Sequence, residues 1–181
     1  MAINTFKNIV KKIFPLTHNI RYDNQTFQIM KIVLEADSTF VDVGCHKGEV
    51  FDHALKCSPK GKHFAFEPIP DLFSELKKKY KDICEVKNYA ITDTCGESEF
   101  HYVVSNPAYS GIKKRSYPKD EIIDKIKIKT STLDKELINE PRVDLIKIDV
   151  EGGEYGVLKG AKKVIEKFHP VFIFEHGLDT T

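Results

Sequence analysis

The sequence predicts an α/β fold in which helices cover a doubly wound, mostly parallel sheet. Two observations predict it. Short apolar runs rich in Val, Ile and Phe alternate with segments of helical periodicity, and the first run leads into a glycine turn followed by a helical pattern. Strands that alternate with helices form parallel sheets with right-handed crossovers. Ligands bind such sheets beyond the carboxyl ends of the strands, so site residues are expected there.

The composition fits one globular domain and argues against several other classes. Of 181 residues, 41% are hydrophobic and 30% charged, and 28 Lys and Arg balance 27 Asp and Glu. This balance argues against a nucleic-acid partner. No apolar run approaches the ~20 residues of a membrane span, and residues 1–20 lack a signal-peptide pattern. Cys45, Cys57, Cys84 and Cys95 form no CxxC pair, so a cytoplasmic protein without a zinc site is expected.

Residues 1–36 are expected to form a helical segment. Apolar residues recur at helical spacing over 3–14 until Pro15, and a second helix is predicted over 25–35. The first of these patterns fits a helix packed on the domain better than a helix lying on a membrane surface.

Residues 37–181 are expected to form the ligand-binding domain. Strands are predicted at 40–43, 63–66, 83–86, 143–148 and 171–174, and helices at 50–56, 72–80 and 155–168. Between the third and fourth strands, 99–104 and 125–129 also alternate like strands. They flank the loop 105–124, which is long enough to be a functional, lid-like loop.

The first site signal is the glycine turn after the strand 40–43. Gly44 and Gly48 allow the backbone to approach a ligand closely, and the following helix begins with free N–H groups. A dinucleotide fingerprint starting at Gly44 would need glycines where the chain has His46 and Glu49, so that fingerprint is absent.

Two further signals lie at the ends of predicted strands. Glu67 follows the strand 63–66, where a carboxylate can accept both hydroxyls of a ribose. Asp149 ends the strand 143–148, and Lys147 inside that buried strand is expected to need a carboxylate partner. Glu154 is expected to favour the start of the next helix, whereas Asp149 is expected to be functional.

These segments together resemble the FkbM-type family of S-adenosylmethionine-dependent methyltransferases. The resemblance covers roughly residues 40–177. The matching residues are Asp42, Gly44 and Gly48 of the glycine loop, Phe66-Glu67-Pro68, the stretch 88–93 followed by Gly96, Thr132-Leu133-Asp134, and 146–154 followed by Leu158-Lys159-Gly160-Ala161. The chain departs from the family's usual pattern at Cys45 and His46, where a small residue and then Asn are common.

The resemblance implies a Rossmann-like class I methyltransferase fold and S-adenosyl-L-methionine as methyl donor. It also implies transfer to a hydroxyl oxygen of a sugar, a glycan or a small-molecule metabolite. The residues carried over as donor-binding are Gly44, Cys45, His46 and Gly48 for the methionine part, Glu67 for the ribose, and Asn88 and Ala90 near the adenine. Asp42 and Pro68 are also carried over as donor-binding residues.

Methyl transfer needs an aligned acceptor and a group that takes the acceptor's proton. The candidate catalytic residues are Asp149, Glu151, Glu175 and His176. A metal-free site is favoured over a divalent cation at these residues, since the motifs do not require a metal. Two other classes stay open: a catalytically inactive nucleotide-binding or scaffold module of the same fold, and a nucleotide-sugar or NAD-linked enzyme, which the missing fingerprint disfavours.

The last predicted strand, 171–174, has apolar side chains on both faces. The chain ends at Thr181, so the closing hairpin of complete methyltransferase sheets is expected to be absent. An unpaired apolar edge invites pairing with another chain. A homo-oligomer that associates through this strand is therefore predicted.

Overall fold

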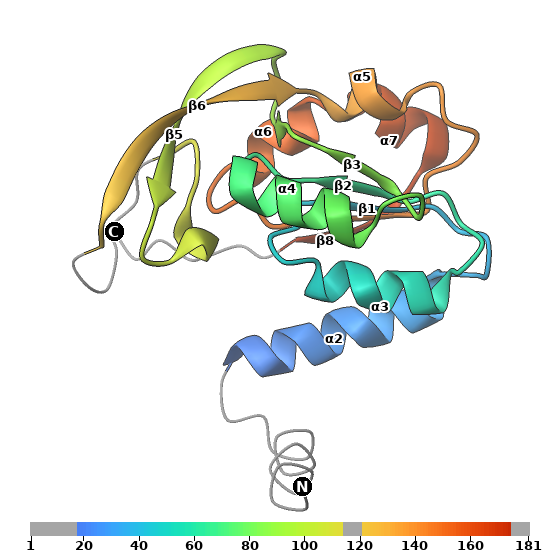
Figure 1. Cartoon of the computed structure of the whole chain (residues 1–181). Coiled ribbons are helices and arrows are strands. Elements are labelled where there is room, and N and C mark those ends of the chain that lie inside the picture. The colour runs from blue at the N-terminus through green and yellow to red at the C-terminus, as the bar shows by residue number, and fades with distance from the viewer. Residues whose placement is uncertain (1–17, 114–120, 175–181) are drawn as a thin grey trace, which may run out of the picture.

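The computed structural model describes residues 18–113 and 121–174, and it confirms the doubly wound α/β fold (Figure 1). The central sheet is entirely parallel, in the order β3-β2-β1-β7-β8. Its strands are β1 (Phe40–Val43), β2 (Phe64–Phe66), β3 (Glu85–Lys87), β7 (Leu145–Ile148) and β8 (Val171–Phe174). The chain runs outward from β1 to β3 and returns to β7, so the strand order reverses between β1 and β7. A ligand is expected at this reversal.

Helices cover both faces of the central sheet. They are α2 (His18–Val33), α3 (Glu49–Cys57), α4 (Pro70–Lys79), α5 (Leu133–Leu137), α6 (Glu154–Lys159) and α7 (Lys162–Phe168). Successive side chains of a strand point to opposite faces, and β1 shows the result. Phe40 packs in one core cluster with Met30, Phe51 and Leu76 of α2, α3 and α4. Val41 and Val43 pack in the other, against α5, α6 and α7.

Helix α2 belongs to the core of this domain. Met30 is fully buried, and the Phe27 ring stacks on the His53 ring of α3 with centroids 4.2 Å apart. Figure 1 shows α2 lying along α3. The helix predicted over 25–35 is confirmed but begins earlier, and the helix predicted over 3–14 lies outside the described residues.

The single helix predicted over 155–168 is wrong, because two helices, α6 and α7, occupy this stretch. The break lies at Gly160, where an added Cβ would clash with the carbonyl oxygen of Thr92. The Gly160 carbonyl accepts the N–H of Asp134 (2.9 Å), and the Asp134 carboxylate in turn accepts the N–H of Val164 (2.9 Å). Neighbouring segments therefore end one helix and cap the next, which local periodicity does not reveal.

A second sheet has the order β4-β6-β5 and includes the two strands predicted between the third and fourth runs. It consists of β4 (Ala90–Ile91), β5 (Gly96–Val103) and β6 (Ile123–Ser131), and a short 3₁₀ helix, η1 (Pro107–Tyr109), follows β5. Phe100 and Ile128 of this sheet pack against Ile69 and Leu72 at the start of α4. Residues 114–120 of the predicted lid-like loop lie outside the described residues.

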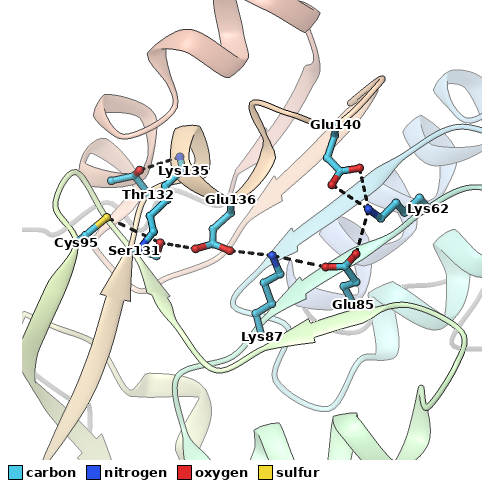
Figure 2. Close-up of polar contacts among 9 residues, drawn as sticks. All are labelled: Lys62, Glu85, Lys87, Cys95, Ser131, Thr132, Lys135, Glu136 and Glu140. Atoms are coloured by element: carbon cyan, nitrogen blue, oxygen red, sulfur yellow. Dashed lines mark hydrogen bonds and ion pairs between the residues drawn. The ribbon is translucent and has the colours of Figure 1, made fainter.

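A chain of polar contacts joins the β3 edge of the central sheet to α5 (Figure 2). We call it the edge network, and it consists of Lys62, Glu85, Lys87, Ser131, Glu136 and Glu140. Lys87 Nζ lies 2.8 Å from Glu136 Oε2, and Ser131 Oγ lies 2.6 Å from Glu136 Oε1. These contacts fix the base of the second sheet against the central one.

Strand β8 pairs with β7 on one side, and within residues 18–113 and 121–174 no strand pairs with its other side. Val171 and Phe174 are 40% and 51% exposed, so β8 is less buried than its sequence indicates. Self-association through β8 stays a prediction. No helix in the described part of the chain is both long and apolar enough to cross a membrane.

Candidate active site

A cavity of about 750 Å³ lies at the carboxyl ends of the central strands. Gly44 after β1, Glu67 after β2 and Asp149 after β7 all line it. Its other walls come from β4, from the η1 region and from α6. The structure thus brings the three strand-end signals of the sequence into one cavity.

The turn after β1 depends on a close approach between two backbone segments. Gly44 has φ 84°, and an added Cβ would clash with the carbonyl oxygen of Asp149. The N–H groups of Gly44 and Cys45 both donate to the Phe66 carbonyl, at 3.0 and 3.1 Å. Only glycine allows β1, β2 and β7 to meet this tightly at the cavity.

The far end of the same turn rests on Tyr80, which follows α4. The Tyr80 hydroxyl lies 2.8 Å from the Gly48 carbonyl oxygen and 2.6 Å from Asp52 Oδ1. Gly48 has φ 77°, and an added Cβ would meet the Tyr80 ring. Tyr80 therefore fixes the end of the turn at Gly48 through its hydroxyl and its ring. The sequence pattern, in which Tyr80 is one apolar residue of a helix, did not indicate this role.

His46 lines the cavity with an unused ring nitrogen. Its Nε2 is buried, and no described residue forms a hydrogen bond with it. Burial lowers the pKa of His46, and the neighbouring charge of Lys47 lowers it further, so the ring is neutral near pH 7. A neutral imidazole offers one N–H donor and one acceptor to a ligand.

Glu67 ties the glycine turn to the end of β2. Its carboxylate accepts the N–H of His46 (2.8 Å) and the N–H of Ile69 (3.0 Å). Only 3% of the residue is exposed, and burial raises its pKa to about 7, although the two N–H groups counteract this. Each carboxylate oxygen can accept more than one hydrogen bond, so the group remains able to bind a ligand hydroxyl.

The predicted adenine-side residues have different roles. The Asn88 side-chain amide donates to the carbonyl oxygens of Glu67 (2.8 Å) and Pro68 (3.0 Å), so its N–H groups are committed to the protein. Pro68, Tyr89 and Ala90 line the cavity. Asn88 is placed to shape this wall.

A buried charge cluster lies beneath the glycine turn. Lys147 Nζ lies 3.1 Å from Asp149 Oδ2 and 3.5 Å from Asp42 Oδ1, which confirms that Lys147 has carboxylate partners. Burial alone would lower the pKa of Lys147, but the two carboxylates raise it.

Asp42 is the buried acid of this cluster, and burial raises its pKa. The Cys45 thiol bonds to the Asp42 carboxylate, whose Oδ2 has no hydrogen-bond partner of ordinary geometry among the described residues. Lys147 and Asp149 line the cavity; Asp42 is not part of its lining.

The remaining acidic residues singled out in the sequence differ in whether they line the cavity. Glu151 lines the cavity and has φ 53°. Glu154 accepts the N–H of Gly152 (2.8 Å) at the start of α6, which confirms its expected role at that helix. Glu175 and His176 lie outside the described residues. Within the described ranges no group of three His, Cys, Asp or Glu side chains could hold a metal ion.

The sequence analysis missed several residues of the cavity wall. Asp23 reaches it from α2, Phe100 from β5, and Tyr155 from α6. No motif signals Asp23, since a single acid on an amphipathic helix is ordinary and its approach to the β1 turn depends on how α2 packs.

The comparisons with known proteins decide the family. Residues 42–180 match the methyltransferase FkbM domain. The chain belongs to this family. It is 30% identical over 168 residues to the hexuronic acid methyltransferase AglP of Haloferax volcanii, covering 89% of this chain and 66% of that protein. It is 25% identical over 161 residues to the 2-O-methyltransferase NoeI of Sinorhizobium fredii, covering 77% of this chain and 64% of that protein.

The chain spans about two thirds of the length of these two relatives. Among solved structures, it is similar to the precorrin-6y C5,15-methyltransferase of Geobacter metallireducens. The TM-score is 0.50 and the identity 16%, covering 87% of this chain and 63% of that one. At this identity the likeness concerns the fold, and it agrees with the Rossmann-like sheet described above.

Proposed function

We propose that this chain is an S-adenosyl-L-methionine-dependent O-methyltransferase that acts on a hydroxyl of a sugar, a glycan or a small-molecule metabolite. One observation carries the proposal: a single cavity joins the glycine turn, Glu67 and Asp149 to a second wall from the η1 region and α6. The names of the relatives, one a hexuronic acid methyltransferase and one a 2-O-methyltransferase, support the acceptor class. All four cysteines are free, which suits a reducing cytoplasm.

The residues present fit the donor. The close approach at Gly44 leaves backbone rather than side chain at the β1 turn, and His46 Nε2 is unpaired among the described residues. The turn from Gly44 to Gly48, with Cys45 and His46, would hold the methionine part. Glu67 would hold the ribose, and Tyr89 and Ala90 would lie along the adenine. When bound, the donor supplies a methyl group already activated on a sulfonium.

The protein then has to orient the acceptor and accept its proton. Asp149 suits the second task, since it lines the cavity and its side chain is 36% exposed. Lys147 holds Asp149 Oδ2, and no described residue bonds to Oδ1. Oδ1 is therefore the atom proposed to receive the proton of the acceptor hydroxyl.

The part of the cavity wall that comes from the η1 region and α6 suits a sugar. Tyr109 and Tyr155 line it, and aromatic faces pack against the apolar faces of sugar rings. Lys159 lines it too, held by an ion pair with Asp93 at 2.7 Å. This wall is proposed to select the acceptor.

Calorimetry with S-adenosylhomocysteine, followed by transfer of a labelled methyl group to a panel of sugars, tests the proposal. Gly44→Ala is expected to abolish binding, because its Cβ clashes with the Asp149 carbonyl. Gly96→Ala is the matched control, since Gly96 also has positive φ but open space around it. Donor binding without transfer to any hydroxyl would favour an inactive nucleotide-binding or scaffold module. Absence of donor binding by the unmodified chain would overturn the proposal.

A further inference from the structure

We propose that Asp23 of helix α2 is an additional donor-binding residue, which pairs with the ammonium group of the donor's amino-acid part. The inference rests on the proposed function, because it concerns the same cavity. Helix α2 precedes residues 42–180, the part of the chain that matches the family. The family match therefore assigns no role to Asp23.

The packing of α2 carries Asp23 to the cavity. Asp23, Phe27 and Met30 follow one another at i, i+4 and i+7, so they share one face of the helix. Phe27 stacks on His53 of α3, and Met30 is fully buried. The same face therefore brings Asp23 into the cavity wall, together with Gly44, His46 and Glu49.

The surroundings of Asp23 contain more negative than positive charge. Asp23 is exposed as a residue, but the partial burial of its carboxyl group in the cavity wall raises its pKa, and repulsion from Glu49 and Asp149 raises it further. Lys147 counteracts this, but its ammonium already contacts Asp42 and Asp149. In the part of the chain that the structure describes, Asp23 forms no ion pair.

A second observation concerns Asp42, which lies beneath the turn. Asp42 is 1% exposed, and its Oδ2 has no hydrogen-bond partner among the described residues, although the Cys45 thiol bonds to the carboxylate group. Lys147 is thus shared between this buried acid and Asp149, so a cation bound in the cavity beside Asp23 and Asp149 would lower the repulsion between these two cavity acids.

The donor's ammonium fits this place better than its sulfonium. An ammonium has three N–H donors for a carboxylate, whereas a sulfonium has none. The ammonium also belongs to the amino-acid part that the glycine turn is proposed to hold. His46 lines the same wall with a free Nε2 that suits the donor's carboxylate. Asp23 and His46 would then bind the two charged ends of one amino acid.

Asp23→Asn tests the inference when two nucleosides are compared by calorimetry. S-adenosylhomocysteine carries the amino-acid part, whereas 5′-methylthioadenosine keeps the adenine and ribose and lacks it. We expect the variant to bind S-adenosylhomocysteine about tenfold more weakly and 5′-methylthioadenosine as tightly as the unmodified chain does. Glu35→Gln is the matched control, an acid in the same amino-terminal region but outside the cavity wall, and it should leave both affinities unchanged.

The melting temperature of the ligand-free protein gives an independent readout. Asp23→Asn removes the repulsion from Glu49 and Asp149, so the variant should melt no lower than the unmodified chain. Unchanged affinity for S-adenosylhomocysteine would overturn the inference and leave the proposed function standing. Equal weakening of both nucleosides would also overturn it, because Asp23 would then act on the shape of the cavity. If the unmodified chain binds neither nucleoside, the proposed function fails as well.

Discussion

The molecule holds two clusters of charge that are built in opposite ways. In the edge network each charged side chain has a partner of opposite charge, as Figure 2 shows for Lys62, Lys87 and Glu136. In the cluster beneath the glycine turn, Lys147 lies between two acids, and one oxygen of Asp42 has no partner among the described residues. The edge network is closed on itself, whereas the cluster beneath the glycine turn borders the proposed site, and perturbed titratable groups tend to gather at functional sites.

The two clusters also differ in how burial acts on them. Burial alone would raise the pKa of Glu136, but hydrogen bonds from Lys87 and Ser131 outweigh it and leave the pKa below its ordinary value. Burial of Asp42 and Glu67 is not outweighed, and their pKa values are raised. Burying Asp42 and Glu67 therefore lowers the stability of the folded state, whereas the paired acids of the edge network do not lower it.

The largest effect is expected from Lys147→Met, which leaves Asp42 buried without its cation. Breaking a buried pair in this way costs about 3–5 kcal/mol of unfolding free energy, measurable by urea denaturation. Adding Asp42→Asn should recover part of the loss. Lys159→Met, which breaks the exposed pair with Asp93, is the control and should change little. A Lys147→Met protein as stable as the unmodified chain would show that Asp42 is already neutral.

Asp149→Asn is expected to reduce methyl transfer about a hundredfold or more, since proton acceptance contributes about 10²–10⁴-fold in enzymes. The amide keeps the shape of the side chain, so the folded state should persist. Single-turnover transfer rates and circular dichroism check the two statements. Asp71→Asn, an exposed acid in the first turn of α4, is the control. Full activity in Asp149→Asn would show that another group accepts the proton of the acceptor hydroxyl.

The pH dependence of stability should reveal Glu67. Its pKa is about 7 in the folded chain, above the ordinary 4.5, so between these values the folded state holds a proton that the unfolded state has lost. The stability of the unmodified chain relative to Glu67→Gln should therefore fall by roughly 2–3 kcal/mol as the pH rises from 4.5 to 7. Denaturation at a series of pH values measures it. Parallel curves for the two proteins would contradict the prediction.

The smallest effect is expected from Glu136→Gln in the edge network. Losing its charge-assisted bond with Lys87 should cost about 1–2 kcal/mol at neutral pH. Because the pKa of Glu136 is lowered by its partners, this contribution is present above pH 4.5 and disappears as the pH falls below that value. Affinity for S-adenosylhomocysteine should not change, which separates this cluster from the one at the glycine turn. A tenfold weaker affinity would show that the edge network also shapes the site.

The sequence reveals those features that depend on neighbouring residues in the chain. All five strands of the central sheet and the turn at Gly44 follow from local pattern, and the structure confirms them. The helix break at Gly160, the commitment of Asn88 to two carbonyl groups and the arrival of Asp23 at the cavity depend on contacts between distant segments. Periodicity and motifs carry no information about such contacts, because each of these residues is ordinary in its local setting.

The ladder between β5 and β6 has a consequence for the length of the segment that joins the two strands. Val103 pairs with Ile123 at its end, and the N–H of Val104 donates to the Ile122 carbonyl at 2.8 Å. Both ends of the intervening segment are thus fixed side by side. Lengthening a loop whose ends are fixed adds little free-energy cost, about 0.6 kcal/mol for each doubling. The number of residues between these two ends can therefore change at little cost to the stability of the domain.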